Sequence, residues 1–79
     1  MELIIDNTNN NEAVLLNFIQ DLITAGNQSG TIVFNESVVI SSNTDDFLFP
    51  SFVTLRFING NKLLIGNRVI RIFGQIERK

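Results

Sequence analysis

Asp45 and Asp46 are the only adjacent carboxylates in the chain and the first candidates for chemistry. Two carboxylates on either side of a glycosidic bond can act as its general acid and base. This pair lies in the polar stretch 42–46, for which a solvated turn is the ordinary explanation. A hard cation such as Ca²⁺ would need about six or more oxygen ligands, and the stretch lacks the spacing of an EF-type loop. We therefore expect neither a catalytic nor a metal site there.

Other catalytic residue types are missing or badly placed. The chain has no His and no Cys, which removes the usual ligands of zinc, haem and iron–sulfur centres. A nucleophile would then depend on unusual Ser–Lys or Ser–Asp pairs. Gly60, Gly66 and Gly74 do not form a phosphate-binding loop, because neither the GK[ST] motif nor a helix follows them. We expect no enzyme activity and no cofactor.

Charge is distributed unevenly along the chain. Seven of the eight acidic residues precede Arg56, and all six Lys and Arg residues lie at or beyond it. This asymmetry predicts that opposite ends of the molecule attract, within one chain or between copies. A basic half can also indicate nucleic-acid binding. The basic residues alternate with apolar ones and lack an aromatic stacking platform, so this remains a lesser alternative.

The N-terminal third is expected to place a helix over residues 10–25, after an arm at 1–9. Glu12 follows Asn9 by three residues, which is the spacing of a capping box. Gly26 stands where a left-handed helix C-cap belongs. One broad apolar face recurs at helical spacing and comprises Val14, Leu15, Phe18, Ile19, Leu22 and Ile23.

Residues 30–76 are expected to form short apolar strands separated by polar turns. Two strand pairs suggest an imperfect repeat, as in two stacked coils of a solenoid. They are Thr31–Phe34 with Val38–Ser41, and Lys62–Ile65 with Val69–Phe73. An antiparallel sheet is the alternative, because the hairpin dipeptide Asn59-Gly60 could join residues 53–58 to residues 62–65.

A family resemblance supports the solenoid. The order of segments resembles the start of right-handed parallel β-helix proteins. These segments are the helix, Ala25-Gly26, the strands Gly30–Phe34 and Val38–Ile40, and the later Phe49–Arg56. Such proteins form the pectate-lyase-like superfamily, which includes polysaccharide lyases, glycoside hydrolases and phage tailspikes. The resemblance spans roughly residues 8–76. It departs from the family pattern at residues 35–37, where members often have Pro and Gly. It implies that catalytic carboxylates and calcium ligands would lie on later coils that this chain lacks.

The expected fold is therefore mainly β, a right-handed parallel β-helix of about two coils capped by an amphipathic helix. The alternative is an α+β fold with an antiparallel sheet. We expect one domain over residues 1–79, with an arm at 1–9, the capping helix at 10–25, coils at 30–76 and a charged tail at 77–79. The partner of Val53–Phe57 would fall beyond Lys79, which leaves an apolar end uncovered. Other copies of the chain would complete it, unless the chain is a fragment.

The expected function is non-catalytic self-assembly into a homo-oligomer, and the resemblance to tailspikes favours a trimer. The expected interface comprises Val33, Leu64, Val69 and Phe73, with Arg56, Arg68 and Arg71 meeting acidic residues of a neighbour. One alternative is carbohydrate binding by Asp45, Asp46, Arg56 or Arg71, and another is nucleic-acid binding. No apolar run approaches the roughly 20 residues of a membrane span, and no signal peptide is apparent, so we expect a cytoplasmic protein.

Overall fold

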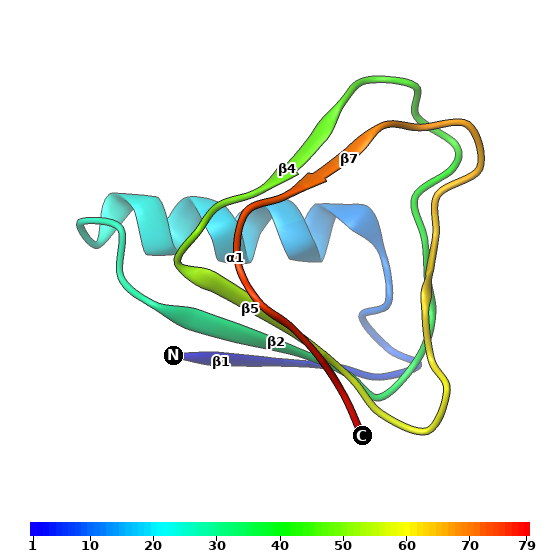
Figure 1. Cartoon of the computed structure of the whole chain (residues 1–79), viewed down its shortest axis with the longest axis horizontal. Coiled ribbons are helices and arrows are strands. Elements are labelled where there is room, and N and C mark those ends of the chain that lie inside the picture. The colour runs from blue at the N-terminus through cyan, green and yellow to red at the C-terminus, as the bar shows by residue number, and fades with distance from the viewer.

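The computed structural model describes residues 1–79 and contains one helix and eight short strands. All strand pairings are parallel, and they form one four-stranded sheet, β1-β2-β5-β8, and two two-stranded sheets, β3-β6 and β4-β7. Figure 1 shows these strands along the three sides of a triangular outline, with α1 crossing behind. The elements are β1 (Glu2–Ile5), α1 (Glu12–Thr24), β2 (Gly30–Phe34), β3 (Val38–Val39), β4 (Phe47–Phe49), β5 (Val53–Phe57), β6 (Leu63–Leu64), β7 (Ile70–Ile72) and β8 (Ile76–Arg78).

The core follows from the alternation of apolar residues on the strands. Successive side chains of a strand point to opposite faces, so every second residue enters the interior. Phe34 of β2 and Phe57 of β5 are register partners, and their rings stack with centroids 4.5 Å apart. Phe47 and Phe49 enter from β4 and are likewise buried. Each of these rings buries about 150–250 Å² and so contributes strongly to the hydrophobic stabilisation.

Helix α1 covers one end of this core. Leu15, Phe18, Ile19 and Leu22 are buried, as the helical periodicity predicts. The cap is Asn11 and not Asn9, because the Asn11 side chain accepts a hydrogen bond from the Val14 amide. Gly26 follows the helix with φ +85°, which confirms the predicted left-handed C-cap residue. A Cβ at Gly30 would lie 2.6 Å from a Leu22 methyl carbon, so α1 packs closely against the start of β2.

The fold class expected from the sequence is wrong. The three small sheets of four, two and two strands do not close, and they do not constitute a β-helix of about two coils. The antiparallel alternative is also wrong, since each pairing is parallel. Asn59-Gly60 forms no hairpin, because β5 and β6 belong to different sheets.

The strand pairing that the expected repeat implies is also wrong. Residues 31–34 pair with residues 54–57 of β5, and not with residues 62–65. The charged tail at 77–79 is not separate either, because Glu77 and Arg78 belong to β8 and pair with Arg56 and Phe57. The chain therefore contains the partner of β5 that was expected to fall beyond Lys79.

Candidate functional site

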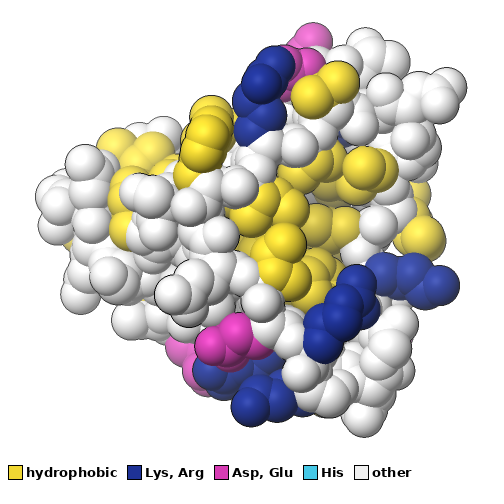
Figure 2. All heavy atoms as spheres, in the orientation of Figure 1, with side chains coloured by type: hydrophobic (Ala, Val, Ile, Leu, Met, Phe, Trp, Pro, Cys, Tyr) yellow, Lys and Arg dark blue, Asp and Glu magenta, His cyan; other side chains and the backbone are white.

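An apolar groove opens at the end of the molecule that α1 does not cover. Its volume is about 200 Å³, and six of its eight lining residues are hydrophobic. Figure 2 shows apolar side chains gathered in a hollow on this face, with basic side chains nearby. Arg78 borders the groove, and its guanidinium lies 5.3 Å from the centre of the Phe57 ring. The lining residues are Phe57, Lys62, Leu63, Ile65, Ile70, Ile72, Ile76 and Arg78.

Unpaired strand edges surround this groove. Strands β6, β7 and β8 each have a partner on one side only. Leu55 donates its amide to the Gln75 carbonyl, and Lys79 donates its amide to the Phe57 carbonyl. By the alternation of a parallel ladder, the amides of Ile76 and Arg78 face away from β5. An apolar floor beside free backbone donors is suited to pairing with another chain.

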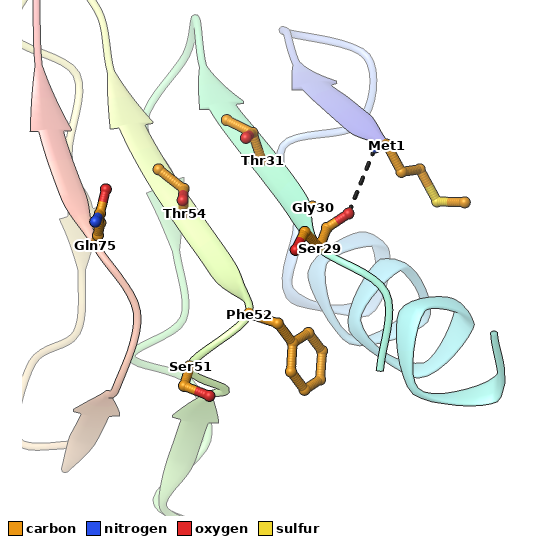
Figure 3. A pocket seen from close by; sticks show the side chains of 8 residues that line it. All are labelled: Met1, Ser29, Gly30, Thr31, Ser51, Phe52, Thr54 and Gln75. Atoms are coloured by element: carbon orange, nitrogen blue, oxygen red, sulfur yellow. Dashed lines mark hydrogen bonds between the residues drawn. The ribbon is translucent and has the colours of Figure 1, made fainter. Parts of the chain in front are cut away.

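A second, polar groove of about 330 Å³ lies on the outer face of the four-stranded sheet. Thr31 and Thr54 are register partners, and Figure 3 shows Gln75 beside them on the next segment. The Met1 ammonium group donates a hydrogen bond of 3.5 Å to the Ser29 carbonyl at one side. Besides this terminus the lining carries no charge, and it comprises Met1, Ser29, Gly30, Thr31, Ser51, Phe52, Thr54 and Gln75.

Arg68, an expected interface residue, is instead buried within the chain. Its side chain is 3% exposed, and two of its nitrogens donate to the Glu12 carboxylate at 2.6 and 3.2 Å. It also donates to the backbone carbonyls of Ile40 and Asp45. Four of its five N–H groups thus have acceptors inside one molecule, so the buried guanidinium is not available to a neighbour.

The other two expected arginines also have partners in the same chain. Arg56 donates to Glu77 at 2.8 Å across β5 and β8. Arg71 lies 3.4 Å from Asp46, and both side chains are more than half exposed. Asp45 donates its backbone amide to the Asn43 side chain, as in an ordinary polar turn. The chain has no cluster of three or more acidic, His or Cys residues that could hold a metal ion.

The expected apolar interface residues do not form one patch. Val33 points outward from β2 but is buried, since Ile4 and Arg56 flank it in register on the neighbouring strands. Leu64 is exposed on β6, whereas Val69 precedes β7 and Phe73 follows it. Val69 and Phe73 thus lie at the two ends of β7 in the β4-β7 sheet, whereas Leu64 lies on the β3-β6 sheet.

Sequence reasoning missed the groove-lining Ile76. It stands alone among polar residues, so the periodicity of apolar residues gives no signal for β8.

No protein family, curated protein or solved structure matches the chain. The resemblance to the pectate-lyase-like superfamily therefore stays a prediction that no relative supports. No helix has the length and apolar character needed to cross a membrane.

Proposed function

We propose that this chain is a non-catalytic association module that binds further copies of itself through the apolar groove. The observation that carries the proposal is the groove, in which an apolar floor meets the unpaired edges of β6, β7 and β8. Exposed apolar surface rimmed by polar groups marks interaction sites on soluble domains. A domain of this size also buries only about 60% of the surface of its unfolded chain, so association adds to a small hydrophobic core.

Light scattering over a wide concentration range tests this proposal directly. We expect an average mass above that of one chain at high concentration, and Ile76→Asp should lower it to that of the monomer. Ile76 lines the groove and is 54% exposed, so the variant places a charge in the groove without opening the core. A wild-type chain that stays monomeric at all concentrations would contradict the proposal.

Phe73→Asp is the matched control for the position of the interface. Phe73 is 62% exposed but lies outside the groove, so its substitution should leave the mass unchanged. Loss of association in Phe73→Asp but not in Ile76→Asp would place the interface on the outer faces of the strands.

Saccharide binding is a second candidate function, favoured by the polar groove. Hydroxyl and amide groups of Thr31, Thr54 and Gln75 lie together there, and the half-buried ring of Phe52 lies at its border. These groups match the donors and acceptors of a neutral sugar. NMR titration with neutral oligosaccharides should shift the Thr54 amide, and Thr54→Val should weaken the effect. An unchanged spectrum at millimolar sugar would exclude this function.

A further inference from the structure

We infer that association is head-to-tail, with the groove at the β8 end of one copy taking up the α1 and β1 end of the next. This inference rests on the proposed self-association and specifies its partner surface. Hereafter the tail is the end with the apolar groove, and the head is the end with α1 and β1. A head-to-tail contact joins two different surfaces and therefore leaves one of each free for further copies.

At both ends of the molecule the four-stranded sheet extends one strand further than the two-stranded sheets, which leaves a step. At the head, β1 extends the four-stranded sheet by one strand beyond β3 and β4, and α1 fills the space beside it. At the tail, β8 extends the same sheet by one strand beyond β6 and β7, and the space beside it is the apolar groove. The groove is thus the counterpart of the site that α1 already occupies at the other end. A helix has a diameter of about 10 Å with its side chains, so it bridges such a step.

One exposed flank of α1 carries residues suited to the groove. Leu16 and Ile23 are exposed although they are large and apolar. They lie seven residues apart, which is close to two helical turns, so they share one side of the helix. This flank borders the buried face of the helix, because Ile23 follows the buried Ile19 by about one helical turn.

The strand edges fit in polarity and register. Strands β1 and β8 are the two free edges of one parallel sheet, so β1 of a second copy can join β8 in parallel. Thr31 donates its amide to the Met1 carbonyl, which leaves the amides of Glu2 and Ile4 facing outward. Continuing the existing register would let Ile4 donate to the Ile76 carbonyl, and Ile76 donate to the Glu2 carbonyl.

Charge favours this arrangement over contact between two tails. Lys62, Arg78 and Lys79 lie at the tail and take part in no ion pair. At the head, β1 begins with Glu2 and is followed directly by Asp6. In the continued register, Lys79 would lie beside Asp6 of the added copy. Two tails would instead bring like charges together, which opposes association.

Two proline variants test the inference. Ile4→Pro removes an outward amide from the head, and Ile76→Pro removes one from the tail, while neither deletes a bond within the four-stranded sheet. Each variant alone should associate about tenfold more weakly, the effect of losing one hydrogen bond. An equimolar mixture should regain association, because an intact tail then meets an intact head. At concentrations where each variant alone is monomeric, the mass of the mixture should level off near two chains. Ile4→Ala and Ile76→Ala are the matched controls that retain the amide.

A second pair of variants, with arginine in place of proline, tests the same contact in case the proline variants misfold. Leu16→Arg blocks the exposed side of α1, and Ile76→Arg blocks the groove, with the same expectation for the single variants and for the mixture. Continued association of Ile4→Pro and Leu16→Arg alone would indicate contact between two tails and overturn the inference, while the proposed function would stand. A wild-type chain that is always monomeric would contradict both.

Discussion

At the scale of single residues, the salt bridge between Arg68 and Glu12 joins the two halves of the chain. The guanidinium of Arg68 is buried, and Glu12, its partner, is only 19% exposed. Arg68→Met should lower the free energy of unfolding by about 2–4 kcal/mol, because Glu12 and two backbone carbonyls lose their donor. Urea denaturation at one fixed protein concentration measures this loss. Arg71→Met removes an exposed pair with Asp46 and should cost less than about 1 kcal/mol, so equal losses would contradict the structural role of Arg68.

Gly74 is required by the close approach of two backbone segments. A Cβ at this position would collide with the Val53 carbonyl oxygen. Gly74→Ala should therefore destabilise the fold by about 2–3 kcal/mol, as overpacking of a backbone contact does. Gly60 has φ +74° and open space around it, so Gly60→Ala should cost only about 1 kcal/mol of backbone strain. Thermal unfolding of both variants compares the two costs, and a smaller loss for Gly74→Ala would contradict this contact.

At the scale of elements, the turn between β1 and α1 is held by Asp6. Its carboxylate accepts hydrogen bonds from the Thr8 hydroxyl and the Thr8 amide, and these lower the pKa of Asp6 below its ordinary value of 3.8. A lowered pKa in the folded state means that this stabilisation is present above pH 3.8 and is lost as the pH falls further. Urea denaturation between about pH 5 and pH 2 should therefore show a shallower decline for Asp6→Asn than for the wild type. An identical pH dependence would contradict this role of Asp6.

Elements with local signals could be predicted from the sequence, and their pairing could not. The helical spacing from Val14 to Ile23 is local, so α1 was predicted to within two residues at each end. The alternation in β5 likewise predicted a strand. Register depends on how the corners between sheets are built, and no single residue encodes it, so residues 31–34 were aligned with the wrong strand. The Arg68–Glu12 salt bridge could not be predicted from the sequence either, because only that register brings the two residues together.

At the scale of the whole molecule, association should weaken with ionic strength. Lys79 and Arg78 at the tail meet the acidic head in the proposed contact, and salt screens such exposed charges. Lys79→Gln should reduce the affinity between copies about two- to fivefold at low salt, the range for one exposed ion pair. Sedimentation at low and at high sodium chloride concentrations measures both effects. Glu36→Gln is the control, since Glu36 belongs to the turn between β2 and β3 and not to β1 or α1. Affinity that is independent of salt would contradict the electrostatic part of the inference.

The parallel pairing of all strands also has a consequence for the rate of folding. Even the closest partners along the chain, Leu55 and Ile76, are separated by an entire circuit of the triangle. Each of these long chain segments must therefore be ordered before its strand contacts offset the loss of chain entropy, and chains dominated by such distant contacts fold slowly. The helix is the one element built from local contacts, and it can form before any sheet exists. While these distant strand pairings form slowly, apolar strands remain exposed to other chains, so refolding should succeed best in dilute solution.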